Sequence, residues 1–370
     1  MRILLTDFHR GWGGQANQVL MLAKQLQQDG NAVLVMAPPD SELLKRIEGT
    51  NVSANNTCNF TRGFRPVSFC KDYFAFKKVI REWKPDIIHT HGSQDNWLAV
   101  IARGCCKKVP PIVRTKHNSF PIKKHFFNRY LMTKLNQHVI AVAETIRKDL
   151  LQIMHPDSCT TIHAGFDDSF KCFEQNEARI SVRNEFNLHE NAVLIGLVGR
   201  FMPEKGQHIL IQSLKKIQES IPEARLLLVG TGGYYNETID YAKSLKLKNY
   251  CIFTGQRDDI ARLTAACDVS VLAAISCDAS STVLKEAMSV CVPVVGTDVG
   301  GTSEILEYGK CGIVIPPNDS AALAEAIIQT LKERNTEKGE ERIQYAYKRV
   351  NQMYRMREIV KRTVSIYSNQ

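Results

Sequence analysis

Hydrophobic residues come in short runs along the chain, and amphipathic stretches separate these runs. In the first half, apolar runs at residues 2–6, 32–37, 86–91, 112–116 and 139–142 predict buried strands. Between the first two runs, the apolar residues of 15–28 recur at helical spacing, and Gly30 ends the segment. Continuous apolar strands that alternate with helices are typical of parallel sheets covered by helices on both faces.

The second half repeats this pattern. Strands are predicted at 192–198, 225–229, 250–253, 269–273, 292–296 and 312–315, and helices at 207–220, 261–266, 282–288 and 320–332. Each half is therefore expected to be a doubly wound α/β domain of Rossmann type. The polar, irregular stretch 165–191 is the best boundary, and a charged helical tract runs from residue 337 to about 367.

These patterns predict an N-terminal domain at 1–170, a C-terminal domain at 171–345, and a terminal helix within 346–370 that crosses back to the first domain. Two such domains facing each other would form a central cleft at the carboxyl ends of their strands, where ligands bind. The 370 residues are 44% hydrophobic, and no run approaches the ~20 apolar residues of a membrane span. The 11 cysteines form no C-x-x-C pair, so we expect free thiols, a reducing compartment and a cytoplasmic protein.

Positive charge is concentrated in one segment. The chain has 48 Lys and Arg against 38 Asp and Glu, but residues 96–143 contain no acid. The segment carries nine cations: Arg103, Lys107, Lys108, Arg114, Lys116, Lys123, Lys124, Arg129 and Lys134. Hydrophobic residues are interleaved with the later ones: Phe120, Ile122, Phe126, Phe127, Tyr130, Leu131 and Met132. We expect this 103–134 region to meet an anionic membrane surface or a phosphorylated substrate, the alternative being a solvated basic face. No helix-turn-helix, zinc-finger or RNP signature indicates nucleic-acid binding.

A glycine-rich loop after the first strand is a candidate anion site. Gly11, Gly13 and Gly14 precede the helix at 15–28, whose N-terminus would add its dipole to the backbone N–H groups. The loop matches the dinucleotide pattern G-x-G-x-x-A only loosely, because residues 7–10 separate it from the strand. The dinucleotide pattern also requires an acidic residue after the second strand, and Asp40 satisfies this requirement only weakly. An NAD enzyme therefore stays an alternative, but the glycine-rich loop does not favour it.

Two further loops lie in the second half. Gly199 and Arg200 leave the end of a strand, and Lys205 precedes a helix; two such cations suit a diphosphate, although surface cations are also common. Asp278 follows another strand, and Glu286 lies about one turn inside the next helix. The small residues between them would offer backbone N–H groups at the start of that helix. As alternatives, Asp278 caps this helix and Glu286 is an ordinary helical residue.

The order and spacing of these residues resemble the nucleotide-sugar site of glycosyltransferase family 4, whose members are retaining enzymes of the GT-B fold. The resemblance rests on Arg200, Lys205, the D-x7-E spacing of Asp278 and Glu286, the Glu-Ala-Met sequence at 286–288, Gly300-Gly301, Gly13-Gly14 and the Pro-Asp-Ile-Ile-His-Thr-His strand at 85–91. In one respect the sequence departs from the family, which usually has E-x7-E with glycines after the first Glu. Here the first acid is Asp278, followed by Ala-Ser-Ser.

The resemblance implies roles for individual residues. Arg200 and Lys205 would hold the diphosphate of a nucleoside-diphosphate sugar, assisted by Gly199 and by N–H groups near Ser281, Thr282 and Val283. Glu286 would hold the ribose, Asp278 would contact the donor sugar, and a pocket near Gln256 would read the base. Gly13 and Gly14 would lie in the first-domain loop, and His117 would face the donor sugar. His89 and His91 share one face of a strand, and His91 would line the acceptor side.

The implied activity is retaining transfer of a sugar to a glycan or anionic glycolipid acceptor, in lipopolysaccharide or cell-surface polysaccharide synthesis. No D-x-D motif occurs, so we expect no metal and no cofactor besides the donor substrate. The enzyme would be cytoplasmic, or peripheral on the cytoplasmic face of the membrane. The alternatives are another sugar-nucleotide enzyme of the same fold, either an epimerase or a soluble sugar-phosphate transferase, and a catalytically silent glycosyltransferase-like protein.

Overall fold

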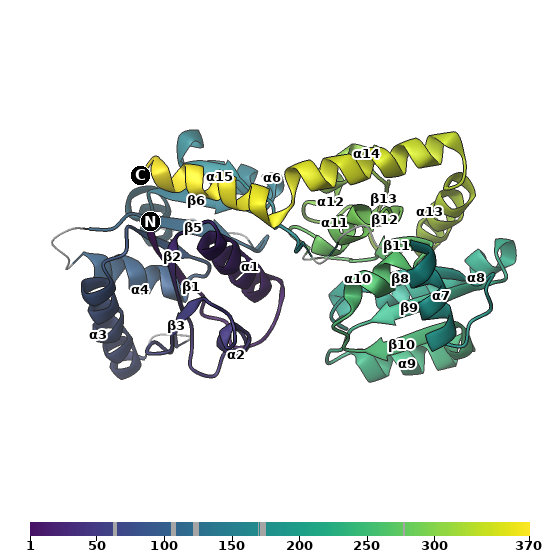
Figure 1. Ribbon diagram of the computed structural model, residues 1–370, viewed down its shortest axis with the longest axis horizontal. Helices are drawn as coiled ribbons and strands as arrows, with labels where there is room; N and C mark the ends of the chain where they lie inside the picture. The colour runs from purple at the N-terminus through teal and green to yellow at the C-terminus, as the bar shows by residue number, and fades with distance from the viewer. Residues whose placement is uncertain (62–64, 105–108, 121–125, 169, 171–174, 277) are drawn as a thin grey trace. The chain divides into compact units, whose positions relative to one another are not determined.

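The computed structural model describes the chain except residues 62–64, 105–108, 121–125, 169, 171–174 and 277. The chain divides into two compact units (Figure 1). Unit 1 contains residues 1–165 and 356–370, and unit 2 contains residues 166–355. The predicted boundaries at 170/171 and 345/346 differ from those of the structure, which lie at 165/166 and 355/356.

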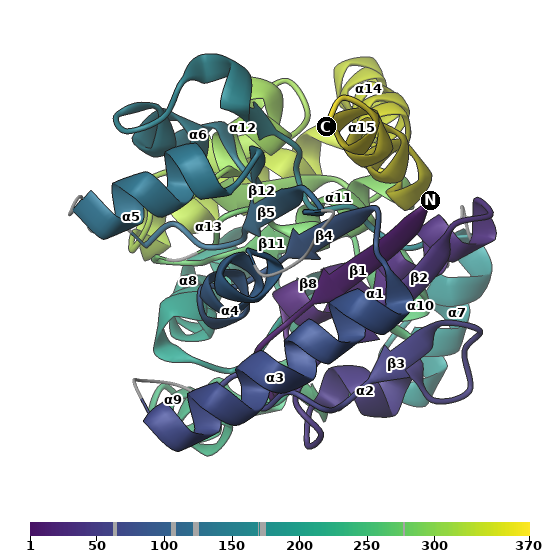
Figure 2. The ribbon, with the colours of Figure 1, turned by 90° about the vertical axis from the view of Figure 1, so that its left-hand side faces the viewer.

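Unit 1 is built on a parallel sheet of seven strands in the order β3-β2-β1-β4-β5-β6-β7. The strands are β1 (Arg2–Thr6), β2 (Ala32–Met36), β3 (Ser53–Asn55), β4 (Ile87–Thr90), β5 (Ile112–Lys116), β6 (His138–Ala141) and β7 (Cys159–Thr161). One face of the sheet packs against α1 (Gly14–Gln28), α2 (Glu42–Ile47) and the terminal helix α15 (Met356–Ser368). The other face packs against α3 (Pro66–Trp83) and α4 (Gln94–Arg103), which Figure 2 shows side by side. Because both faces are covered, Ile3, Leu4 and Leu5 of β1 are all fully buried.

Unit 2 is built on a six-stranded parallel sheet in the order β10-β9-β8-β11-β12-β13. The strands are β8 (Val193–Val198), β9 (Ala224–Val229), β10 (Cys251–Gly255), β11 (Val269–Leu272), β12 (Val294–Thr297) and β13 (Ile313–Ile315). The helices α7 (Gln175–Glu185), α10 (Ile260–Ala265), α11 (Thr282–Ser289) and α14 (Glu337–Met353) pack on one face. The helices α8 (Gln207–Ser220), α9 (Tyr235–Ser244) and α13 (Ser320–Glu333) pack on the other. The prediction of two doubly wound parallel-sheet domains is confirmed.

The structure corrects one detail of the predicted organisation and refines another. The stretch 165–191 is not irregular throughout, because it contains α7. The charged tract at 337–367 is not one helix, because it breaks between α14 and α15 at Tyr354 and Arg355. There the carbonyl of Tyr354 accepts a hydrogen bond from the backbone N–H of Phe166 at 3.1 Å, and Phe166 and Arg355 form an isolated parallel bridge. The tract breaks at the point where the chain passes from unit 2 to unit 1.

Candidate functional site

The candidate residues of unit 2 follow three adjacent strands. The chain order reverses at β8, which lies between β9 and β11, and ligands of doubly wound sheets bind at such a switch point. Arg200 and Lys205 follow β8, Asp278 follows β11, and Gly300 follows β12. The fold therefore brings four residues separated by up to 100 positions to one end of the sheet.

Lys205 and Asp278 form an ion pair at this switch point. Lys205 Nζ lies 2.9 Å from Asp278 Oδ2, and the two side chains are 28% and 13% exposed. Gly206, with φ +69°, follows Lys205 directly and is the N-cap residue of α8, and a Cβ there would lie 1.8 Å from the carbonyl oxygen of Ala273. Only glycine allows this close approach, which fixes the lysine next to the end of β11.

The backbone of Asp278 is held from its other side by the glycine pair after β12. Gly300 has φ +57°, and a Cβ on it would lie 1.8 Å from the carbonyl oxygen of Asp278. The interpretation of Asp278 as a cap of α11 is wrong. Ser281 is the N-cap residue of α11, and its side chain makes no capping hydrogen bond.

Glu286 and Lys285 occupy the helix that follows this loop. Burial chiefly raises the pKa of Glu286 to about 7, although Lys285 and a hydrogen bond with Thr282 act in the opposite direction. Lys285 is fully buried, and its Nζ donates a hydrogen bond to Ser280 Oγ at 2.8 Å. Its ammonium also lies 4.9 Å from the centroid of the Tyr354 ring, and burial lowers its pKa to about 7.

Sequence reasoning missed Lys285. The only signal was its helical spacing from the apolar Met288, which places it on the packed side of α11. Its contacts link the loop that carries Asp278 to the end of α14.

The remaining predicted residues of unit 2 take no part in the Lys205–Asp278 ion pair. Arg200 is exposed, and its carbonyl accepts a hydrogen bond from Gln207 Nε2 at 2.9 Å. Gly199 donates its N–H to the carbonyl of Val229 at 2.9 Å. Gln256 is exposed after the edge strand β10, which β9 separates from β8, so the structure does not place it beside the ion pair. Thr282 and Val283 are the first two residues of α11.

The switch point of unit 1 lies between β1 and β4. Gly13 is the N-cap residue of α1, and Gly14 is its first residue, with open space where a Cβ would project. Asp7, which the sequence analysis did not single out, is fully buried at the end of β1. Its Oδ1 accepts a hydrogen bond from Gln15 Nε2 at 2.8 Å and lies 3.0 Å from His9 Nδ1.

Three histidines lie at the ends of β4 and β5. The rings of His89 and His91 are 4.2 Å apart, which confirms that they share one face. His89 contacts Thr115 Oγ1 at 2.7 Å and the Tyr367 hydroxyl at 2.6 Å, so both of its ring nitrogens are used within the core. His91 instead contacts His117, through Nδ1 and Nε2 at 2.9 Å.

The interpretation of the nine cations at 103–134 as one surface is wrong for three of them. Arg103, Arg114 and Lys116 are buried, and each makes hydrogen bonds inside unit 1. Arg103 bonds to Gln137 Oε1 at 2.8 Å, Arg114 to Asn96 Oδ1 at 3.2 Å, and Lys116 to the Phe120 carbonyl at 2.8 Å. Lys107, Lys108, Lys123 and Lys124 lie outside the described residues, whereas Arg129 and Lys134 are exposed.

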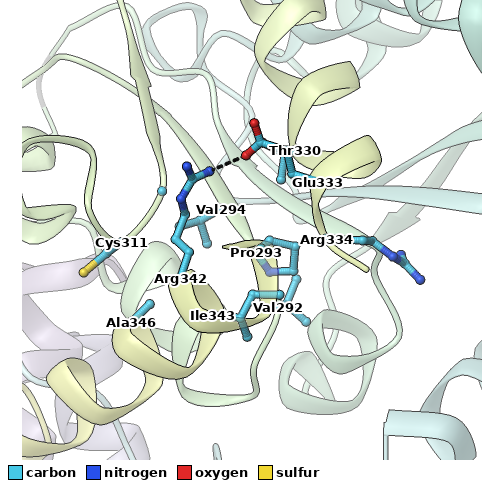
Figure 3. A pocket seen from close by; sticks show the side chains of 12 residues that line it. Val292, Pro293, Val294, Cys311, Thr330, Glu333, Arg334, Arg342, Ile343 and Ala346 are labelled. Carbon is cyan, nitrogen blue, oxygen red and sulfur yellow. Dashed lines mark hydrogen bonds and ion pairs between the residues drawn. The ribbon is translucent and has the colours of Figure 1, made fainter. Parts of the chain in front are cut away.

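A cavity at the opposite end of the unit 2 sheet is not a nucleotide site. Figure 3 shows it between the start of β12 and the helices α13 and α14, where Arg342 and Glu333 pair at 3.0 Å. Its volume of about 20 Å³ holds roughly one water molecule. Across the part of the chain that is described, no three His, Cys, Asp or Glu side chains are arranged to hold a metal ion. Among the same residues, no helix has both the length and the apolar character needed to cross a membrane.

The comparisons with known proteins identify the family. Residues 12–170 match the model of Glycosyltransferase Family 4, and residues 179–349 match that of Glycosyl transferases group 1. Together the two matches cover most of the chain. The chain therefore belongs to the family 4 glycosyltransferases, and it is a glycosyltransferase of the GT-B fold.

Individual relatives are distant. The chain is 26% identical to an N-acetyl-alpha-D-glucosaminyl L-malate synthase of Bacillus anthracis over 62% of its length, and this match spans 58% of that relative. It is 26% identical to a phosphatidyl-myo-inositol mannosyltransferase of Mycobacterium leprae over 86% of its length and 84% of the relative. Anabaena Alr3699/HepE, solved in complex with UDP, has the same fold; it is 24% identical, the match covers 100% of both chains, and the TM-score is 0.85.

Proposed function

We propose that this glycosyltransferase transfers a sugar from a nucleoside-diphosphate sugar to a glycan or glycolipid, with retention of the anomeric configuration. The observation that carries the proposal is the Lys205–Asp278 pair at the switch point of unit 2, with Arg200 on the same loop. The pair places a cation for the leaving diphosphate next to a carboxylate for sugar hydroxyls. The similar Anabaena protein has been solved with UDP and with UDP-glucose, which favours a uridine nucleotide as the first donor to test.

In this proposal the charge that develops on the diphosphate is stabilised by groups already in place. Lys205 and Arg200 supply the cations, and the N–H groups of the first turn of α11 add donors. Glu286 would accept hydrogen bonds from the ribose hydroxyls, and burial, which raises the pKa of its carboxyl to about 7, would make this group more readily protonated than an exposed glutamate. The two cations neutralise the diphosphate without a metal ion.

The test of the proposed function is product analysis. The protein is incubated with UDP, GDP and ADP sugars and a panel of glycan and glycolipid acceptors, after a thermal-shift screen has selected the nucleotide. We expect one nucleotide to raise Tm, and the product of its sugar to keep the anomeric configuration by NMR. EDTA should leave turnover unchanged, whereas inhibition reversed by a divalent ion would contradict the metal-free proposal. An inverted product would contradict retention.

We also propose that the acceptor is an anionic glycolipid and that unit 1 binds the membrane surface through α5 (Phe126–Tyr130), on the cytoplasmic face. Phe126 and Phe127 are 73% and 68% exposed, and the ring of Phe126 stacks on that of Tyr130. Exposed Arg129 lies on the same helix. Exposed aromatic residues beside a cation are the composition that favours an anionic lipid interface. Acceptors of this kind occur in lipopolysaccharide and cell-surface polysaccharide synthesis.

Changing Phe126 to Ser together with Arg129 to Glu should weaken binding to anionic liposomes about tenfold or more, because each lost cation contact contributes about 1 kcal/mol and the aromatic adds to it. Co-sedimentation measures the binding. Phe74→Ser on α3 is the matched control, since Phe74 is 65% exposed. Wild-type binding should fall as salt rises. Equal losses in the two variants, or binding that salt does not affect, would argue against α5 as the membrane contact.

A further inference from the structure

The imidazoles of His91 and His117 form a hydrogen-bonded pair at the carboxyl ends of β4 and β5. His91 Nδ1 lies 2.9 Å from His117 Nε2, and the two rings are stacked at 5.2 Å. A hydrogen bond between two ring nitrogens requires that one carries a proton and that the other offers its lone pair. The direction of this bond therefore determines the tautomer of both rings.

Both rings are neutral at physiological pH. Burial lowers the pKa of His117 to about 4, with a smaller opposing effect from Asp7, and it lowers the pKa of His91 well below its usual range. Each ring then has a single N–H, which leaves two arrangements. In the first, His91 Nδ1–H donates to His117 Nε2; in the second, His117 Nε2–H donates to His91 Nδ1.

The surroundings of His91 favour the first arrangement. Its other nitrogen, Nε2, is buried and has no hydrogen-bond partner among the described residues. In the second arrangement this nitrogen would be a buried N–H without an acceptor. In the first it is only an unused lone pair, and unpaired buried donors are rarer in folded proteins than under-used acceptors.

We propose that His91 is a positioning residue that holds His117 in the Nδ1–H tautomer. His117 is partly exposed, so its Nδ1–H is a hydrogen-bond donor available to a ligand. That donor recognises an oxygen atom, such as a sugar hydroxyl or ring oxygen. This choice of ligand rests on the proposed function, whereas the tautomer does not.

Neighbouring elements fix the backbone of His91, and with it the position from which its ring projects toward His117. The N–H of His91 donates to the Thr6 carbonyl at 3.2 Å and to Asp95 Oδ2 at 3.1 Å. The N–H of Gly92 donates to the same Asp95 oxygen at 3.1 Å. A Cβ on Gly92 would lie 2.0 Å from the Phe8 ring, so any larger residue here would have to displace that ring. Strand β1 and helix α4 therefore hold the backbone that carries the His91 ring.

Nitrogen NMR on ¹⁵N-histidine-labelled wild-type protein tests the tautomer directly, because protonated and unprotonated ring nitrogens resonate in separate ranges. The ten histidines are assigned with single His→Gln variants. We expect a protonated Nδ1 and an unprotonated Nε2 in His117. A protonated Nε2 in His117 at pH 7 would overturn the proposal, whether or not the enzyme is active.

Variants of His91 test the consequence. His91→Asn keeps an N–H donor close to the place of Nδ1, whereas His91→Leu has none. We expect His91→Leu to lower kcat/KM by up to about 10²-fold, the effect of losing one preorganised donor, and His91→Asn to recover most of this loss. Tyr367→Phe is the control, because it removes a contact of the neighbouring His89 and leaves the pair intact.

The two kinds of failure can be told apart. If NMR gives the expected tautomer and the Leu and Asn variants are equally impaired although both fold, the pair exists but does not position a ligand donor, and the functional part of the proposal is overturned. If no sugar is transferred by the wild type, the proposed function fails while the NMR result stands.

Discussion

Replacing Lys205 by Ala should lower kcat by about 10²–10³-fold at saturating donor, which is the usual effect of removing one preorganised group that stabilises developing charge. Arg200→Ala should have an effect of the same order. The structure predicts that the two variants differ in thermal stability. Lys205 is paired with Asp278 and mostly shielded, so its loss leaves a carboxylate without its partner. Arg200 is exposed, so its loss should leave Tm nearly unchanged.

The measurement is steady-state kinetics with the donor selected by thermal shift, together with Tm of each variant. Lys205→Ala should destabilise the fold by about 1–2 kcal/mol, between the values for exposed and buried pairs. Lys216→Ala is a matched control, because Lys216 forms an exposed pair with Glu325 away from the switch point. Wild-type turnover in both Arg200→Ala and Lys205→Ala would remove these residues from the site.

Asp278→Ala should abolish sugar transfer, with a loss of at least about 10²-fold, and yet should retain affinity for the free nucleoside diphosphate. The ion pair with Lys205 predicts in which direction the affinity for the nucleoside diphosphate changes. Removing the carboxylate takes away both a competing partner of the lysine and a negative charge near the diphosphate. Affinity for the nucleoside diphosphate should therefore rise, by up to about tenfold or about 1.4 kcal/mol.

Calorimetry with the nucleoside diphosphate measures this affinity, and product formation measures transfer. Glu286→Ala should behave in the opposite way and weaken the nucleoside diphosphate itself. Asp278→Glu introduces the glutamate that the family usually has at this position, and this variant should transfer the family's typical donor sugar. If Asp278→Ala lowers Tm but transfers sugar at the wild-type rate, Asp278 supports the fold only, and the assigned sugar contact is wrong.

Periodicity was sufficient to predict most of the sheet strands, because buried parallel strands are nearly continuous apolar runs. It missed β3 and β7, which have three residues each and lie at the two edges of the unit 1 sheet. Neither strand is an apolar run, because β3 reads Ser-Ala-Asn and β7 reads Cys-Thr-Thr, whereas β13 is equally short but was predicted from its apolar residues. The break at Tyr354 was missed for a different reason: it depends on a hydrogen bond with Phe166, which is nearly 200 residues away.

At the candidate site, too, the sequence patterns could not predict contacts between residues that are distant along the chain. Motif spacing indicated Lys205 and Asp278 but not their ion pair, because the pair exists only where β8 and β11 are neighbours. Alternation along a strand placed His89 and His91 on one face, but the partner of His91 is His117, which depends on how β4 pairs with β5. The charge count could not show that Arg103, Arg114 and Lys116 are buried, because counting charges carries no information about depth.

The division of the chain also determines the order in which the protein is completed during its synthesis. Residues 166–355 are continuous, so unit 2 has all its elements before the last helix is made. Unit 1 lacks α15 until the end, and with it Val360 and Tyr367, which pack in its core. At a synthesis rate of 5–20 residues per second, roughly 10–40 s pass between the synthesis of the last strand of this sheet and that of α15. During that time the part of α1 that α15 covers is open, which makes the half-built first unit the aggregation-prone stage of the nascent chain.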